Sequence, residues 1–280
     1  MKNNKAMNEI FDFKRFWTYF KYDLKQMWRN HSKAAILIGG ASALFYVVWV
    51  MFSLVFTQSW HTPPVEARFL VFGLAFGILE LYMVRSYGYL TEKKAGSAWL
   101  MVPASKAEKF VSMLLVSLVV IPVLFFLVYF LIDGFLSVVD PTYGKALAVG
   151  FFSTYSEMVN ALSTIGNSAS SPISFTPASL VFPAIVSTLG SFLYFLLCGI
   201  CFKKNKLVIA IAITFGLSLA LSLLMGIFAP AIFKNFDYNV DEARIASWAV
   251  GFANAMVVLN CLVAVGLGWG VWRRIKTIQH

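Results

Sequence analysis

The sequence predicts an all-α, polytopic membrane protein, and three observations lead to that prediction. Of the 280 residues, 59% are hydrophobic and only 13% are charged, whereas a soluble domain carries about 25% charged residues. Six stretches contain the roughly 20 apolar residues that a helix needs to cross the hydrocarbon core. Most Lys and Arg residues fall in segments that six crossings would place on one side. This composition argues against a soluble enzyme.

The expected spans are residues 34–56, 69–90, 110–132, 178–202, 207–233 and 245–272. Six crossings put both termini on one side, and the segments on that side hold 19 of the 23 Lys and Arg residues. Because short cytoplasmic loops are enriched in positive charge, we expect both termini in the cytoplasm. The net charge of +10 is then explained by the membrane surface, with no nucleic-acid partner.

The chain is expected to form a cytoplasmic N-terminal segment, residues 1–33, and one membrane domain, residues 34–280. That domain includes a cytoplasmic loop, 91–109, and an external segment, 133–177. Residues 146–165 are apolar enough to be considered as a seventh span. A crossing there would move six positive charges to the outside, against the charge rule, so we expect an external amphipathic helix instead.

Residues 11–29 show aromatic and aliphatic side chains at three- and four-residue spacing, with cations between them. The apolar positions are Phe13, Phe16, Trp17, Phe20, Leu24, Met27 and Trp28. Such a pattern is typical of a helix that lies in the membrane interface. Two interpretations remain open: a general surface anchor, and an elbow helix that supports a transporter bundle.

The loop 91–109 contains its own helix signals. Thr91 is a candidate N-cap for a short helix that Pro103 ends, and Ser105 with Glu108 forms a capping box for the next span. We expect Trp99, Leu100 and Met101 to face the cytosol as a docking surface for a soluble partner. The alternative is that these three side chains dip into the membrane interface.

These segments resemble the permease subunits of bacterial ABC-2 type exporters. The resemblance rests on the amphipathic helix 11–29, on the loop 89–110 with its Pro103-Ala-Ser-Lys-Ala-Glu-Lys109 end, and on six spans with cytoplasmic termini. It is most specific over residues 11–134. The long external segment after the third span is a departure, because many members place external helices between the fifth and sixth spans.

The resemblance implies an ATP-driven exporter in the bacterial cytoplasmic (inner) membrane. Two permease subunits, as a homodimer or a heterodimer, would enclose the path of an amphipathic or hydrophobic compound. The loop 91–109 would be the coupling helix that contacts a separate ATP-binding subunit. This nominates six coupling residues: Glu92, Lys93, Lys94, Trp99, Leu100 and Met101.

Three polar residues within the expected spans are candidates for a cavity. Glu80 is expected to be the one buried charge in a span, either as a cavity-lining group or as a structural carboxylate at a helix interface. Asn254 and Asn260 in the last span either hydrogen-bond between helices or face a polar cavity.

The sequence predicts no catalytic residue, cofactor or metal on this chain. It lacks the G-x-x-x-x-G-K-[ST] loop that cradles phosphates, so ATP hydrolysis would belong to a partner chain. Cys198 and Cys201 have no second Cys or His pair to complete a zinc site. Two other functions remain open beside the exporter: a non-transporting membrane anchor for a cytosolic protein, and an ion-coupled secondary transporter.

Overall fold

The computed structural model describes residues 11–153, 156–157, 160, 177–233 and 242–277. Within these residues all regular structure is helical, which confirms the predicted all-α class. The helices are α2 (Phe13–Gly39), α3 (Ala41–Thr57), α4 (Val65–Ser86), α5 (Lys93–Met101), α6 (Lys106–Leu115), α7 (Ile121–Val139), α9 (Pro177–Cys201), α10 (Lys206–Phe233) and α11 (Glu242–Thr277). The short helices η1 (Gly88–Thr91) and η3 (Pro141–Tyr143) follow α4 and α7.

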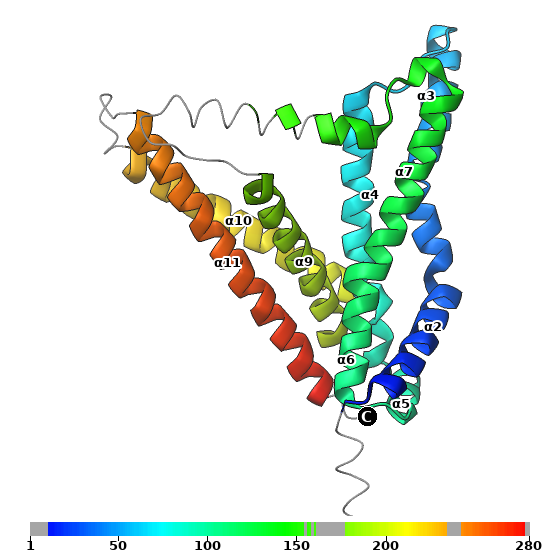
Figure 1. Cartoon of the computed structure of the whole chain (residues 1–280), viewed down its shortest axis with the longest axis vertical. Helices are drawn as coiled ribbons and strands as arrows, with labels where there is room; N and C mark the ends of the chain where they lie inside the picture. The colour runs from blue at the N-terminus through cyan, green and yellow to red at the C-terminus, as the bar shows by residue number, and fades with distance from the viewer. Residues whose placement is uncertain (1–10, 154–155, 158–159, 161–176, 234–241, 278–280) are drawn as a thin grey trace, which may run out of the picture.

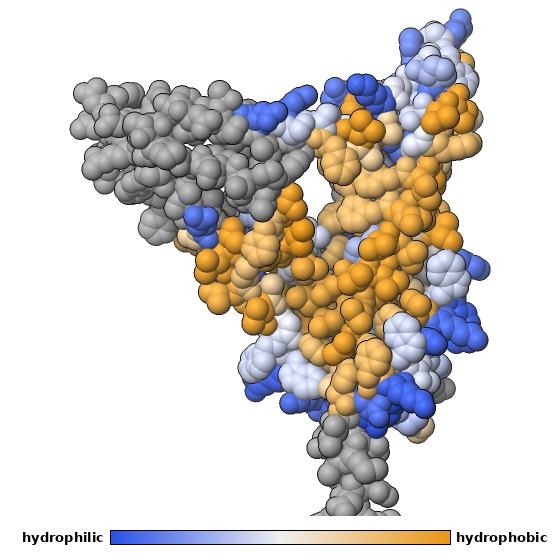
Figure 2. Space-filling model, viewed as in Figure 1, coloured by the Kyte–Doolittle hydropathy of each residue, from blue (hydrophilic) through white to orange (hydrophobic). Residues whose placement is uncertain are grey.

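Five helical segments in the described part of the chain are long and apolar enough to cross a membrane. They are Val65–Thr91, Lys106–Val139, Val181–Cys201, Lys206–Leu224 and Asn254–Thr277. A sixth candidate is the pair Lys33–Gly39 and Ala41–Thr57, which is bent by 50°. Figure 2 shows apolar side chains over the middle of the molecule and hydrophilic ones towards its ends, as a multi-pass membrane protein requires.

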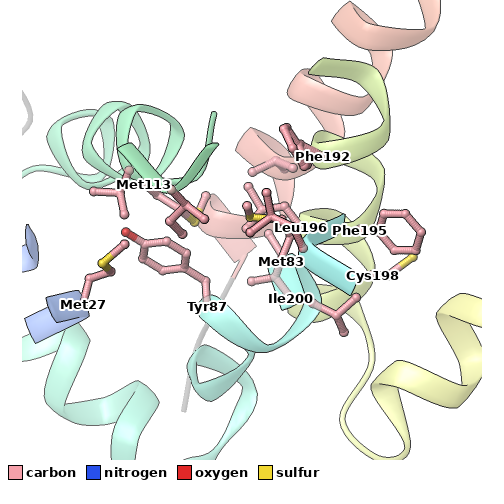
Figure 3. Close-up of a cluster of buried hydrophobic side chains, with 14 of the residues drawn as sticks. Met27, Met83, Tyr87, Met113, Phe192, Phe195, Leu196, Cys198 and Ile200 are labelled. Atoms are coloured by element: carbon pink, nitrogen blue, oxygen red, sulfur yellow. The ribbon is translucent and has the colours of Figure 1, made fainter. Parts of the chain in front are cut away.

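The helices form two groups that meet at one end (Figure 1). One group contains α2, α3, α4 and the continuous rod of α6 and α7, and the other contains α9, α10 and α11. Helix α9 contacts α4, α10 and α11 and so joins the groups. Figure 3 shows the apolar cluster at this junction, to which α9 contributes the fully buried Leu196 and Ile200.

The first expected span differs from the structure. Helix α2 continues from Phe13 through residues 30–33 and ends at Gly39, so the break lies inside the expected span 34–56. No helix-breaking residue occurs before the Gly39-Gly40 pair, where helix propensity is lowest. Gly39 also permits close packing, because a Cβ there would lie 2.8 Å from Cγ1 of Val128 on α7.

A π-helical turn, η2 (Val116–Val120), joins α6 to α7. Pro122 explains its position: a proline lacks the N–H group of a regular helix, and its ring clashes with the carbonyl four residues earlier. One wider turn just before Pro122 relieves that clash and lets the rod continue. The predicted third span is therefore one uninterrupted helical segment, Lys106–Val139.

Two expectations are corrected near Val139, where this rod ends. Helix α7 continues past residue 132 to Val139, and α4 begins at Val65 rather than at 69, so Asp133 and Arg68 both lie in candidate membrane-spanning segments. Their side chains are 1% and 2% exposed and form an ion pair with an Nη2 to Oδ1 distance of 2.8 Å. Glu80 is therefore not the one buried charge in a span. The ion pair satisfies both charges, which makes their burial tolerable.

The Arg68–Asp133 pair also holds the start of the segment that follows α7. Asp133 accepts hydrogen bonds from the Tyr143 hydroxyl at 2.9 Å and from the Leu147 backbone N–H at 2.6 Å. Arg68 donates to the carbonyl oxygens of Tyr143 and Lys145. The chain after α7 is thus fastened to α4 and α7 by a buried charged centre.

The external amphipathic helix predicted at 146–165 is described only in part. Residues 147–153, 156–157 and 160 are helical, and residues 147–153 run across the direction of α4 and α7 (Figure 1). Phe151 packs on Phe69 and Phe72 of α4, with ring centroids 4.9 and 5.2 Å apart. The other residues of 146–165, apart from Ala146, lie outside the described residues.

Gly199 allows α9 to approach the backbone of α4. A Cβ at this position would overlap the Val84 carbonyl oxygen and lie 3.1 Å from its carbon. We expect Gly199→Ala to destabilise the protein by about 1–3 kcal/mol, because a rigid backbone must shift. The matched control is Gly216→Ala on α10, where a Cβ meets nothing within 4 Å. Denaturant titration of both variants in mixed micelles tests this prediction, and equal midpoints would contradict it.

Candidate functional site

The short helix predicted in the loop 91–109 is present as α5, Lys93–Met101. Its N-cap is Glu92 rather than Thr91. Thr91 instead ends η1, where its hydroxyl donates to the Gly88 carbonyl oxygen at 3.0 Å. Val102 follows the helix in an extended conformation, and Pro103 comes next, as the sequence indicates.

Trp99 does not face the solvent, contrary to the expectation from sequence. Its side chain is only 6% exposed, and its indole N–H donates to the Tyr19 hydroxyl of α2 at 3.0 Å. The indole occupies the apolar junction between α5 and the neighbouring helices. An indole gains from burial when its N–H finds a partner, which explains why it turns inward. Trp99 therefore attaches α5 to α2.

Lys109 anchors the C-terminal end of α5. Its ammonium group lies 4.7 Å from the centroid of the Trp99 ring. It also donates to the carbonyl oxygens of Trp99 at 2.8 Å and of Leu100 at 3.4 Å. The last carbonyls of a helix lack partners within the helix, and a cation there satisfies them and favours the negative end of the dipole. Lys109 thereby joins the end of α5 to α6.

Glu108 connects the base of α6 to the start of α2. The predicted capping box is confirmed: Ser105 accepts from the Glu108 N–H at 3.1 Å, and Glu108 accepts from the Ser105 N–H at 2.8 Å. The same carboxylate, which is 0% exposed, pairs with Arg15 at an Nη2 to Oε1 distance of 2.7 Å. It also accepts from the Asp12 N–H at 2.9 Å. One carboxylate thus accepts backbone hydrogen bonds at the N-termini of two helices, α2 and α6, and pairs with one guanidinium.

Asp23 supplies a third connection between α2 and the spans. Its carboxylate accepts from the Tyr87 hydroxyl at 2.8 Å and from the Ser112 hydroxyl of α6 at 2.6 Å. Tyr87 lies between Met27 and Met113 in the buried apolar cluster that Figure 3 shows. Burial raises the pKa of the Asp23 carboxyl, and these two hydrogen bonds oppose that rise. Residues of α2 therefore contact α5, α6 and the end of α4 as one unit, which we call the α2–α5–α6 junction.

A pocket of about 530 Å³ opens beside this junction. Lys14, Thr18 and Tyr22 of α2 line one side, and Val102 and Pro103 line the other. Immediately before Val102, Met101 is 82% exposed. An exposed apolar side chain next to a pocket provides a surface that a partner can cover.

The six nominated coupling residues therefore differ in their surroundings. Glu92 and Met101 are exposed, Leu100 is half-buried and Trp99 is buried. Lys93 and Lys94 lie in the first turn of α5, and their side chains are outside the described part of the structure. Of the four with described side chains, Glu92 and Met101 are the most available for contact.

The three candidate cavity residues are not brought into one site. Glu80 is half-buried and accepts a hydrogen bond from the Ser191 hydroxyl of α9 at 2.5 Å, which fits the structural interpretation of this carboxylate. Asn254 is exposed and Asn260 is half-buried on α11. Both asparagines lie on a helix whose main contacts are with α9.

Sequence reasoning missed four residues that build the junction: Arg15, Tyr19, Asp23 and Lys109. The capping box indicated that Glu108 occupies a defined position, but nothing local predicts its pairing with Arg15, 93 residues away. Of these four residues, Asp23 is the one that a sequence feature could have identified. Apart from the N-cap Asp12, it is the one acidic residue in the basic stretch 11–29, and a carboxylate buried on such a helix needs a hydrogen-bond or ionic partner.

Comparisons of the chain with protein-family models, with curated proteins and with solved structures find no match.

Proposed function

We propose that this protein is the membrane-spanning permease subunit of an ATP-driven ABC-2 type exporter. A separate ATP-binding subunit would supply the energy, and two permease subunits, identical or different, would enclose the path. The cargo would be an amphipathic or hydrophobic compound leaving the cell. In this proposal the bent α2–α3 pair is the first of six spans, and both termini lie in the cytoplasm of a bacterium.

The observation that carries the proposal is the α2–α5–α6 junction. A short helix between two spans is attached by Trp99 to α2 and by Lys109 to α6. Glu108 then ties α6 back to the beginning of α2. A rigid element that contacts a cytosolic partner transmits that partner's movement only when it is fixed to the spans. A flexible connector between two spans needs none of these buried contacts.

The junction gives each part a role in the proposed mechanism. The ATP-binding subunit would press on the exposed side of α5, around Met101. Trp99 would transmit the displacement to α2, which would act as the elbow helix. Lys109 would transmit it to the rod of α6 and α7. A shear of these helices against α9 would switch the permease between inward-closed and outward-open states.

The first test is purification of the tagged protein in mild detergent, identification of co-purifying chains, and an assay of ATP hydrolysis. We expect a stoichiometric partner with a phosphate-binding Gly-rich loop. A protein that purifies alone while folded, or with a partner that lacks ATPase activity, would favour the anchor or the secondary transporter.

Met101→Asp tests the contact itself. Because hot-spot residues contribute 2 kcal/mol or more, we expect the affinity for the ATP-binding subunit to fall at least about 30-fold. The protein should stay folded, since this side chain has few internal contacts. The matched control is Phe152→Asp, another exposed apolar residue, in the helical segment 147–153 that packs against the beginning of α4 through Phe151. Equal affinities in a pull-down titration of both variants would overturn the assignment of α5 as the contact.

A further inference from the structure

A second pocket lies where α2, the end of α4 and the start of α10 meet, outside the α2–α5–α6 junction. Its volume is about 620 Å³. Arg85 from the last turn of α4, Lys203 from the turn before α10 and Lys206 at the start of α10 line it. Glu92 is the one carboxylate among its lining residues. The charged lining therefore has a net charge of +2.

The cations of this pocket differ in how they are held. Lys206 donates a short hydrogen bond to the Gly88 carbonyl oxygen, which fixes it in the wall. Arg85 and Lys203 are exposed, and the two ion pairs of the described residues, Arg15–Glu108 and Arg68–Asp133, include neither of them. The amide groups of Gln26 and Asn30 on α2 line the same space and add neutral hydrogen-bond donors. The pocket thus offers several N–H groups to an anion.

The position of the pocket restricts what that anion is attached to. Leu207 and Val208 form part of its lining, are exposed, and begin the candidate span Lys206–Leu224. Arg85 lies near the end of the candidate span Val65–Thr91. The polar part of the pocket is therefore at the level of lipid head groups, and its apolar part continues towards the acyl region.

From these observations we propose that the pocket binds a phosphate group at the membrane surface. Arg and Lys side chains pair with phosphate oxygens through charge-assisted hydrogen bonds, and basic pockets between membrane helices suit anionic head groups. The phosphate belongs to an anionic phospholipid or to a soluble phosphate compound, and the two sources share this chemistry. The proposal does not depend on the exporter function.

The test compares two double variants of the full-length protein. Arg85→Gln with Lys203→Gln removes two charges from the pocket. Lys204→Gln with Arg273→Gln removes two exposed charges that do not line it. Both variants lose the same net charge, so non-specific attraction to an anionic surface falls equally. Thermal unfolding in phosphocholine-detergent micelles checks that each is folded. Where the double pocket variant unfolds, Lys203→Gln is compared with Lys204→Gln, and these two single variants again lose equal charge.

Native mass spectrometry then measures retention of phosphatidylglycerol relative to phosphatidylcholine. We expect the apparent affinity for phosphatidylglycerol to fall more than about 10-fold in the pocket variant and less than about threefold in the control, because two charge-assisted contacts are lost only in the first. Glycerol 1-phosphate is tested in parallel on protein stripped of anionic lipid. Binding there at lower concentration than the lipid would assign the site to a soluble phosphate compound. Equal losses in the two variants, or no loss in the pocket variant for either probe, would overturn the proposal.

Discussion

Asp133→Leu is expected to reduce the stability of the protein by about 3–5 kcal/mol, because it leaves the buried Arg68 guanidinium without its counter-charge. Removal of the carboxylate also takes away the hydrogen-bond acceptor of the Tyr143 hydroxyl and of the Leu147 N–H. A loss of this size is a large fraction of the stability of an ordinary domain. We expect poor yield of monodisperse protein in detergent and a lower denaturant midpoint for what remains.

A double-mutant cycle separates the ion pair from other effects of the substitution. Arg68→Met with Asp133→Leu should be clearly more stable than the sum of the two single losses predicts, because no charge is then left unpaired. Glu66→Gln is the matched control, since Glu66 is an exposed carboxylate two residues from Arg68. Simple additivity in the cycle would contradict a direct interaction between the two charges.

Glu108→Gln is expected to have the second largest effect, through the α2–α5–α6 junction. The carboxylate accepts from Arg15 and from the backbone N–H groups of Asp12 and Ser105. A glutamine has one acceptor oxygen, so its NH₂ group must face a donor. We expect a loss of about 1.5–3 kcal/mol, the range for hydrogen bonds to charged groups, and the partial exposure of Arg15 favours the lower half of that range.

Under the proposed function, Glu108→Gln also has a consequence that stability alone does not produce. The ATP-binding subunit should still bind, because Met101 and its surroundings are unchanged. ATP hydrolysis should persist while transport into inverted vesicles falls, since the ion pair that holds the base of α6 to the start of α2 is lost. Arg15→Lys should give an intermediate loss, because it keeps the charge but not the forked geometry. A coupling role for this contact would be contradicted if the ratio of transport to ATP hydrolysis stayed the same as in the wild type in both variants.

The segment that follows α7 has a second anchored carboxylate. Asp140 accepts hydrogen bonds from Thr142, from the Tyr46 hydroxyl of α3 and from the Trp60 indole N–H. The Thr142 and Tyr46 hydrogen bonds are the main causes that lower its pKa to about 2. Asp140 therefore remains charged at every physiological pH. Together with Arg68 and Asp133, it fixes the start of the segment that follows α7.

The candidate site was only partly predictable, and particular residues show why. The existence of α5, its end near Pro103 and the Ser105–Glu108 capping box all depend on residues within four positions of one another. Such local patterns can be recognised in a sequence. The burial of Trp99 depends on Tyr19, 80 residues away. A hydropathy pattern places an aromatic residue near the membrane interface but does not say whether a neighbouring helix covers it.

The sequence by itself determined the helical class, the multi-pass character and the approximate position of each apolar segment. These follow because lipid requires every backbone polar group to be satisfied within a helix, and the length and apolarity of a spanning helix are local properties. Only the tertiary structure decided which charges are buried. Arg68 and Asp133 looked like surface charges because each stands at the edge of an apolar run, 65 residues apart. The cost of burying a charge is set by its partner, and the partner is known only once the helices are packed.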